Sequence, residues 1–117
     1  MEYVPPEIGE CVQLKELHLP VNWLRTVPRA IGKCRSLEVI DVSSNNLTTL
    51  PVELWECPKL KKVYLYKNCI YKDLPGISKA TGLTVLNIND NSIAYDQNSE
   101  VYQLSERIKG LSLTQLK

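Results

Sequence analysis

The 117-residue sequence predicts an α/β solenoid, in which short parallel strands form a curved sheet and short helical turns cover its convex side. Three observations carry this prediction: a 23-residue period, an asparagine at the same place in four successive units, and aliphatic residues at fixed offsets from it. A unit of this size cannot bury its apolar face alone, so neighbouring units must stack to close a core.

The first half of each unit predicts a strand and the turn that ends it. Position one is a leucine in all four units, and positions four and six are aliphatic, so the last two point to one face of a strand. Position nine is always asparagine. We expect its short amide to bond backbone groups of the turn, with stacked copies continuing as a ladder. These residues are Asn22, Asn45, Asn68 and Asn91.

The second half of each unit predicts a return segment and one helical turn. A proline sets the backbone of the return segment in the first units, at Pro5, Pro28 and Pro51. Positions eighteen and twenty-one are three residues apart and small or apolar, which places them on one face of a short helical turn. This turn is expected to cover the convex side.

Cysteine occupies position twenty-one in three of these turns, as Cys11, Cys34 and Cys57. We expect all three to be small buried hydrophobes that fill the convex core. Cys69 lies in a column with Trp23, which should face solvent, so it is expected to be the most accessible thiol. Trp55 is expected to lie over a neighbouring unit.

Four segments, LKELHLPVNWL, LEVIDVSSNNL, LKKVYLYKNCI and LTVLNINDNSI, match the pattern L-x-x-L-x-L-x-x-N-x-L. The chain thereby resembles the leucine-rich repeat family. The continuations TVPRAIGKC and TLPVELWEC resemble its 23-residue, Leu-Pro-bearing class, which is common in intracellular scaffold and regulatory proteins. The resemblance extends from residue 1 to about residue 95 and implies a right-handed leucine-rich repeat solenoid.

We expect residues 1–117 to form a single leucine-rich repeat domain. The expected divisions are a half repeat at 1–13, full repeats at 14–36, 37–59 and 60–82, an irregular repeat at 83–107, and a truncated strand or cap at 108–117.

Two places depart from the repeat. Leu74 and Pro75 come one residue late, which predicts a local bulge in the third return loop. Near the end, Asn98 or Ser99 is expected to cap a helix that runs to about Arg107. A last short strand at 108–113 should follow, although the same residues also permit a truncated fifth repeat that starts at Ile108 without that helix.

Composition excludes several function classes. Lys and Arg number 14 against 13 Asp and Glu, a net charge of +1, so no concentrated positive field predicts nucleic-acid binding. No apolar run approaches the roughly 20 residues of a membrane span. The N-terminal segment MEYVPPEIGE does not resemble a signal peptide, so we expect a cytoplasmic protein with reduced thiols.

Residues for catalysis or cofactor binding are scarce. The chain has one histidine and no C-x-x-C pair, so we expect no metal site. None of the motifs for nucleophilic catalysis, phosphate binding or dinucleotide binding occurs among its five glycines, so we expect neither an enzyme nor a cofactor.

The outward-facing residues of the strands are the candidate binding site. The third unit stands out, because two tyrosines lie there among three lysines. Tyrosine gives a large contact area at low conformational cost, and lysine adds long-range attraction. We predict partner-binding residues on the concave face. They are Lys15, His18, Asp41, Lys61, Lys62, Tyr64, Tyr66, Lys67, Asn87 and Asn89.

A non-catalytic module that binds a protein or peptide is therefore the predicted function. Strand spacing gives the concave face about 430 Å², against about 800 Å² for one side of a standard interface. Either the partner also grips edges and loops, or the affinity is modest, or the chain is part of a longer array. An alternative is a structural or self-associating unit that contacts through exposed strand edges. The resemblance also permits a regulatory subunit of a signalling enzyme.

Overall fold

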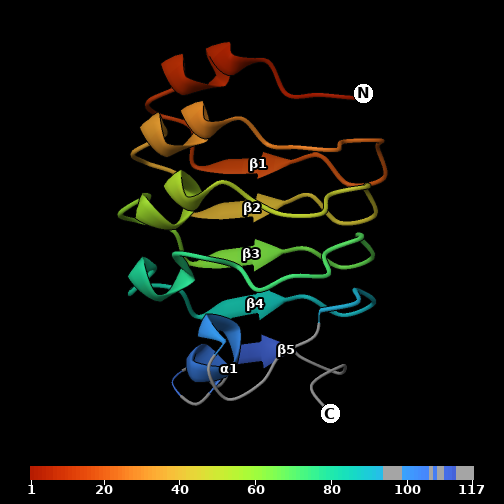
Figure 1. Ribbon diagram of the computed structural model, residues 1–117. Coiled ribbons are helices and arrows are strands. Elements are labelled where there is room, and N and C mark those ends of the chain that lie inside the picture. Colours follow the sequence, from red (N-terminus) through yellow and green to blue (C-terminus); the bar gives the residue numbers. More distant parts are fainter. Residues whose placement is uncertain (94–98, 106, 108–109, 113–117) are drawn as a thin grey trace.

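A computed structural model describes residues 1–93, 99–105, 107 and 110–112. The described residues form one parallel sheet of five strands, paired in the order in which they occur in the chain. Each 23-residue unit forms one rung of the solenoid. The rungs stack one above another, with helical turns along one side and loops along the other (Figure 1). This architecture confirms the predicted α/β solenoid. The strands are β1 (Glu16–His18), β2 (Val39–Asp41), β3 (Lys62–Tyr64), β4 (Val85–Asn87) and β5 (Gly110–Ser112).

Strand pairing places equivalent positions of successive units side by side. Glu16 pairs with Val39, Val39 with Lys62, and Lys62 with Val85, so each step is 23 residues. The last step, from Val85 to Gly110, is 25 residues. Because the register repeats, a residue type at one position becomes a column across the sheet.

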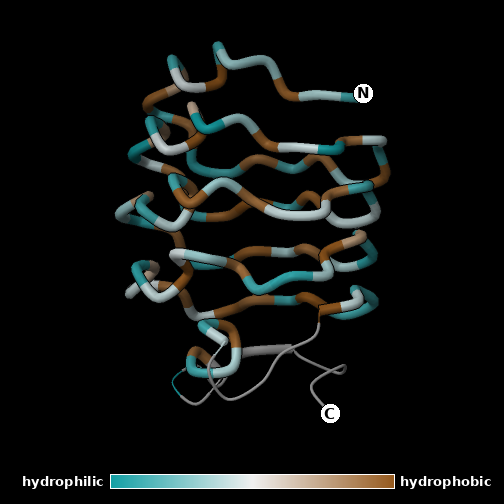
Figure 2. The backbone as a smooth tube through the Cα atoms, in the orientation of Figure 1, coloured by the Kyte–Doolittle hydropathy of each residue, from teal (hydrophilic) through white to brown (hydrophobic). Residues whose placement is uncertain are grey.

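The core lies between the sheet and the return segments. The two inward residues of β2 and its flank, Ile40 and Val42, are fully buried, and Val63 and Leu65 repeat them in the next rung. Hydrophobic stretches accordingly recur at the same places on successive rungs (Figure 2). In the first rung Leu17 and the residue two positions on are only half-buried, because β1 lies at the edge of the sheet.

The asparagine column forms the predicted ladder. The Asn45 Oδ1 accepts a hydrogen bond from the Leu24 N–H at 3.0 Å, and its Nδ2 donates to the Val42 carbonyl at 2.9 Å and the Leu19 carbonyl at 3.0 Å. One side chain therefore closes its own turn and bonds the unit before it. Asn68 and Asn91 repeat this arrangement and are likewise buried.

The helical turns on the convex side are short 3₁₀ helices. In each of the first three, a proline with extended backbone occupies the N-cap, as the sequence predicts. A residue so fixed directs the chain out of the return segment and into the turn. The turns are η1 (Pro6–Glu10), η2 (Arg29–Lys33), η3 (Val52–Glu56) and η4 (Ile77–Lys79).

The cysteine column is only partly buried, which corrects one expectation. Cys34 and Cys57 are buried, and their thiols donate to the carbonyls of Ile8 at 3.2 Å and Ile31 at 3.5 Å, one unit earlier. Cys11 is exposed instead. Its turn, η1, is the first that the structure describes, so no earlier turn covers this thiol.

The third return loop ends in a glycine that packs against a tryptophan. Gly76, with φ +88°, stands at the N-cap of η4, where a Cβ atom would lie 3.3 Å from the Val52 Cβ and 3.6 Å from the Trp55 Cδ1. Trp55 is fully buried, as expected for a side chain that lies over its neighbour. One unit earlier the small partner is Gly32, packed against Glu53. Where η2 has Gly32, η3 has the large Trp55. The segment that packs against Trp55 has Gly76 where the one that packs against Gly32 has Glu53.

The C-terminal helix α1 (Glu100–Ser105) begins at the expected serine, because the Ser99 Oγ accepts the Tyr102 N–H at 3.0 Å. The helix is shorter than expected, and Arg107 lies in a turn with its N–H bonded to the Leu104 carbonyl. Asn98, Ile108 and the expected strand end at 113 lie outside the described residues. Within the described ranges, no helix has the length and apolar character needed to cross a bilayer.

Candidate functional site

The concave face is built from two columns of outward-facing strand residues, at positions three and five of each unit. The column at position five consists of His18, Asp41, Tyr64 and Asn87, which strand pairing places on adjacent strands. His18 is exposed, and the other three are half-buried. Tyr64 therefore lies between an acid on one side and an amide on the other, with part of its ring open to a partner.

Charged side chains on this face pair partly with one another. The His18 Nε2 lies 2.8 Å from the Glu16 Oε1, and the Lys61 Nζ lies 3.6 Å from the Glu38 Oε1. The Lys67 Nζ lies 5.9 Å from the centre of the Tyr66 ring. Apart from the half-buried Glu38, these side chains are exposed, and such contacts contribute little to stability, so a bound partner can replace them at small cost.

Two polar residues of the position-five column are held by their own turns. The Asp41 Oδ1 accepts the Ser43 N–H at 3.0 Å, and the Asn87 Oδ1 accepts the Asn89 N–H at 3.1 Å. Each bond fixes the side chain where its strand ends. Tyr64 is thus flanked by two acceptors of defined position rather than by mobile side chains.

The ten predicted site residues fall on four neighbouring rungs. Strands β1 to β4 carry His18, Asp41, Lys62, Tyr64 and Asn87, whose columns the pairing brings together. The remaining five flank the strands. Lys15, Lys61, Tyr66 and Lys67 are exposed, and Asn89 is half-buried.

Sequence reasoning missed the backbone conformation at position eight. Val21, Ser44, Lys67 and Asp90 all have φ between +55° and +57°. The chain turns sharply there after each strand, so this position borders both the concave face and the loops. Repetition of the position in every unit was the available signal, but no single residue type marks it.

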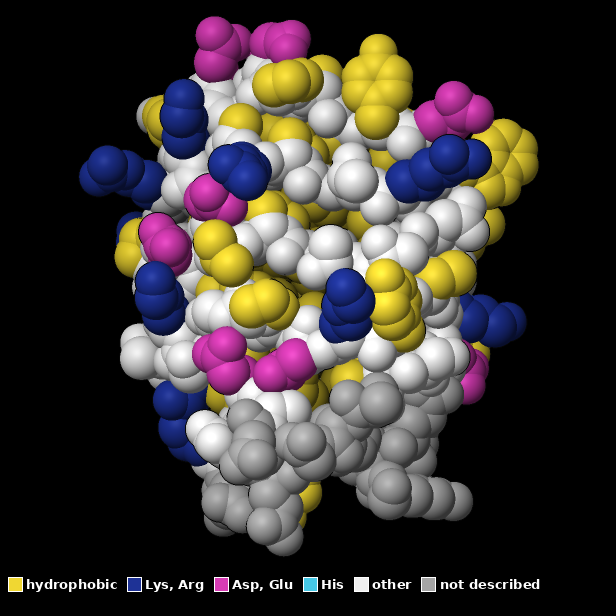
Figure 3. All heavy atoms as spheres, in the orientation of Figure 1, with side chains coloured by type: hydrophobic (Ala, Val, Ile, Leu, Met, Phe, Trp, Pro, Cys, Tyr) yellow, Lys and Arg dark blue, Asp and Glu magenta, His cyan; other side chains and the backbone are white. Residues whose placement is uncertain are grey.

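A column of alternating charge on the helical turns was also missed. Position twenty reads Glu10, Lys33, Glu56 and Lys79, and the Lys79 Nζ lies 3.6 Å from the Glu56 Oε2. Acidic and basic side chains are interleaved along this side of the molecule (Figure 3). The column alignment would have found this alternation. It gives the turns a neutral surface rather than a field of one sign.

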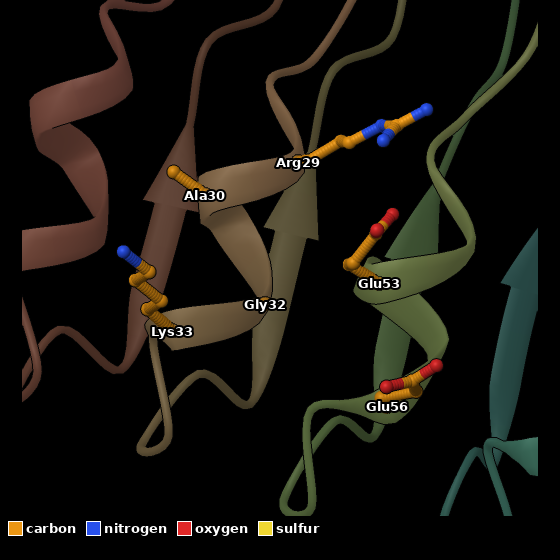
Figure 4. A pocket seen from close by; sticks show the side chains of 6 residues that line it. All are labelled: Arg29, Ala30, Gly32, Lys33, Glu53 and Glu56. Carbon is orange, nitrogen blue, oxygen red and sulfur yellow. The ribbon is translucent and has the colours of Figure 1, made fainter.

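A hollow of about 470 Å³ lies on the convex side between η2 and η3. Ala30 and Gly32 of η2 and Glu53 and Glu56 of η3 are among the residues that line it. Arg29 reaches toward η3, where Glu53 and Glu56 stand, whereas Lys33 points to the opposite side (Figure 4). The charged groups do not converge on one point, so the hollow offers no organised ligand site.

The described residues do not bring three or more histidine, cysteine or acidic side chains into one group that could hold a metal ion. Burial is the main cause that raises the pKa of Cys57 to about 11, with smaller contributions from Cys34 and Glu56. Burial also raises the pKa of Cys34. Both thiols are therefore protonated at neutral pH, which is the opposite of what a nucleophile requires.

The sequence profile described as Leucine rich repeat matches residues 12–70, about half of the chain. The chain belongs to the leucine-rich repeat family. This fold is commonly a protein–protein interaction module and is generally non-enzymatic. No curated protein sequence matches this leucine-rich repeat chain.

Solved structures of other leucine-rich repeat proteins resemble this one. A leucine-rich repeat protein of Leptospira interrogans matches 95% of the chain with 27% identity and a TM-score of 0.86. The plant peptide hormone receptor RGFR1, solved in complex with RGF2, matches 78% with 27% identity and a TM-score of 0.72. The ectodomain of the receptor kinase GASSHO1 from Arabidopsis thaliana, in complex with CASPARIAN STRIP INTEGRITY FACTOR 2, matches 79% with 29% identity and a TM-score of 0.72.

These similar proteins are longer than the chain. It spans 28% of the Leptospira protein, 15% of RGFR1 and 11% of the GASSHO1 ectodomain. The similarity therefore covers the repeat architecture and only part of each of those proteins.

Proposed function

We propose that this chain is a non-catalytic module that binds a protein or peptide segment through its concave face. The main observation behind this proposal is the position of Tyr64, which is half-buried between Asp41 and Asn87 on adjacent strands. The exposed Tyr66 lies two residues further along the chain. Lys62 lies two residues before Tyr64 on β3, and the Lys67 Nζ lies 5.9 Å from the centre of the Tyr66 ring. Tyrosine is one of the residue types that dominate binding energy at protein interfaces.

Two similar structures support the choice of a peptide ligand. RGFR1 and the GASSHO1 ectodomain were each solved in complex with a partner, RGF2 and CASPARIAN STRIP INTEGRITY FACTOR 2 respectively. An extended segment suits a small concave sheet, because it gains main-chain and side-chain contacts without needing a broad flat surface.

A double substitution tests the site. We expect Tyr64→Ala with Tyr66→Ala to weaken binding of a captured partner by at least about 2 kcal/mol while folding is retained. Tyr71→Ala is the matched control, because Tyr71 is also an exposed tyrosine but lies in the loop that follows the asparagine turn. Calorimetric titration of the purified partner into the three proteins measures the effect. Equal affinities for all three would refute the concave site.

We also propose that the protein works in a reducing compartment such as the cytoplasm. Cys34 and Cys57 are accommodated as thiols, since each Sγ donates to a backbone carbonyl in the preceding unit. Thiol-specific labelling of the protein recovered from its native source tests this. Cysteines recovered in oxidised form would refute it.

The open edge of β1 favours a second candidate function, self-association. β1 ends the sheet that the described residues form, and an unpaired strand edge can add a strand from another chain. Light scattering behind size-exclusion chromatography tests this candidate. A monomer mass that persists at high protein concentration would exclude it.

A further inference from the structure

Exposed apolar side chains gather at the N-terminal end of the solenoid. Of eight large hydrophobic residues exposed among the described residues, five lie within the first 23 positions. Tyr3 and Trp23 are each 68% exposed, and Val21 is 79% exposed. Side chains of this size rarely stay in water as a group unless they contact a partner.

Backbone bonds hold this group in place. The Trp23 N–H donates to the Met1 carbonyl at 3.0 Å, and the N-terminal ammonium donates to the Asn22 Oδ1 at 3.1 Å. The two segments therefore lie side by side, on the loop side of the first rungs. Between them lies a hollow of about 510 Å³, lined by Glu2, Tyr3, Trp23, Arg25 and Thr26. Tryptophan, tyrosine and arginine are the residues enriched at interface hot spots.

The backbone of Val21 gives a second, independent indication. Its φ of +57° lies in the left-handed region, where a β-branched residue is a genuine outlier. The equivalent residues Ser44, Lys67 and Asp90 share this conformation but are polar and not β-branched. The Val21 N–H donates to the Ser43 carbonyl at 3.0 Å, so the turn imposes this conformation on whichever residue stands there. An exposed valine is thus a departure from the polar residues of the other units. Backbone strain of this kind is typical of functional positions.

The charge of the loop side indicates what the partner carries. The loop segments 20–26, 43–49 and 66–72 contain three cations, Arg25, Lys67 and Lys72, and no acidic residue, so that Glu2 is the one acid that lines the hollow beside Arg25. They lie on the same side of the rungs, opposite the helical turns (Figure 1). Arg25 is on the first rung and the two lysines are on the third, about 10 Å away at the usual strand spacing. An extended peptide covers that distance in about three residues.

We propose that the loop side of the first rungs, formed by Tyr3, Val21, Trp23 and Arg25, binds an extended acidic–apolar protein segment. An apolar side chain of the segment enters the hollow between Tyr3 and Trp23. A neighbouring carboxylate pairs with Arg25, and a second carboxylate about three residues on reaches Lys72 on the third rung. None of Tyr3, Val21, Trp23, Arg25 and Lys72 belongs to the concave set, so this proposal can fail without the proposed function failing, and the reverse.

Probe peptides test the proposal with the full chain. Three capped nine-residue peptides are compared: one with leucines and aspartates spaced three residues apart, one with lysine for aspartate, and one with serine for leucine. In ¹H–¹⁵N spectra, we expect the acidic–leucine peptide to shift the Trp23 indole N–H signal saturably. The indole signal of Trp55, which is fully buried, is the internal control and should not move. The other two peptides should bind at least tenfold more weakly.

Variants separate the contributions, with binding followed by the fluorescence anisotropy of the labelled peptide. Trp23→Ala and Arg25→Glu should each weaken the acidic–leucine peptide at least tenfold, and Arg25→Glu should strengthen binding of the lysine peptide. Val21→Asn relieves the backbone strain, so it should raise the unfolding midpoint yet weaken the peptide severalfold. Tyr64→Ala with Tyr66→Ala should leave this affinity within twofold.

Four results would overturn the proposal. The first is the lack of a saturable shift at Trp23, and the second is equal binding of the acidic and lysine peptides. The third is a Trp23 shift that depends on protein concentration without peptide, which would assign the surface to a second copy of the chain. Loss of peptide binding only in the Tyr64 and Tyr66 variant would place the segment on the concave face instead.

Discussion

Asp73, which precedes η4, caps the N-terminal end of α1, and Glu100, the first residue of α1, caps the N-terminal end of η4. The Asp73 carboxylate accepts the Glu100 N–H at 2.7 Å and the Val101 N–H at 3.1 Å. In return, the Glu100 carboxylate accepts the Gly76 N–H at 2.9 Å and the Ser78 Oγ–H at 2.7 Å. Each acid lies where the positive end of a helical turn favours negative charge. This exchange joins α1 to the third repeat.

Removal of one acid should weaken that junction. We expect Asp73→Ala to lower the free energy of unfolding by about 1–2 kcal/mol, because two helix N–H groups lose a charged acceptor. Asp73→Asn keeps one side-chain oxygen and should lose about half as much. Urea unfolding followed by circular dichroism measures both. A loss below about 0.3 kcal/mol in Asp73→Ala would show that the bonds do not stabilise the junction.

The same junction should respond to pH. The Gly76 N–H bond, followed by the Ser78 hydroxyl, holds the pKa of Glu100 below its ordinary value of 4.5. A carboxylate with a lowered folded-state pKa stabilises the protein above its unfolded pKa and loses that contribution as pH falls through the folded value. The stability difference between wild type and Glu100→Gln should therefore be constant near pH 7 and shrink below about pH 4.5. A difference that is independent of pH would contradict this, and Glu7→Gln, at an exposed acid of η1, is the control.

Glycine is required at one of two neighbouring sites. Gly76→Ala places a Cβ atom in the left-handed region at φ +88° and 3.3 Å from the Val52 Cβ, so we expect a loss of at least about 1 kcal/mol. At Gly82 a Cβ atom would meet only the Leu60 carbonyl at 3.5 Å, an ordinary contact. Gly82→Ala should change stability by less than about 0.5 kcal/mol. Thermal unfolding of the two variants compares them, and equal losses would disprove the role of Gly76.

The contribution of each asparagine of the ladder to stability should differ along the chain. Asn45→Ala removes bonds to Leu24, Leu19 and Val42 in a buried site, and we expect a loss of about 1–3 kcal/mol. Asn22 is only half-buried and its Oδ1 bonds the N-terminal ammonium. Water can replace that partner, so Asn22→Ala should cost less. Chemical unfolding that ranks Asn22→Ala as the more damaging change would argue against a cooperative ladder.

The four thiols should divide into two classes. Cys11 and Cys69 are exposed, whereas Cys34 and Cys57 are buried. Because the pKa of Cys57 is raised to about 11, its reactive thiolate stays scarce until the pH approaches that value. At pH 8 we expect iodoacetamide to modify Cys11 and Cys69 first, as shown by mass spectrometry of digests. All four should react in urea, and early modification of Cys57 in the native protein would contradict its burial.

Much of the fold could be predicted because its determinants repeat. The asparagine ladder, the strand faces and the prolines before the turns each depend on one residue type at a constant offset, and local geometry suffices to interpret them. The Cys11 prediction was wrong because it extended the repeat to a turn that has no neighbour on one side. The helix at Ser99 was found from its cap, but its end was set two residues too far.

The ten concave residues remain a prediction, since a column of exposed side chains does not by itself identify a partner. What the structure adds is their setting: Tyr64 between Asp41 and Asn87, and Lys61 already paired with Glu38. These pairings depend on side-chain positions across strands, which a single sequence leaves open.

The sequence by itself determined the period, the parallel order of the strands and the inward face of each rung, because a stacked repeat converts offsets along the chain into columns. Only the tertiary structure decided what happens where stacking changes. Gly76 makes room for Trp55, and Asp73 and Glu100 exchange caps across two repeats. The reason is that each depends on contact between residues of different units, which no local pattern records.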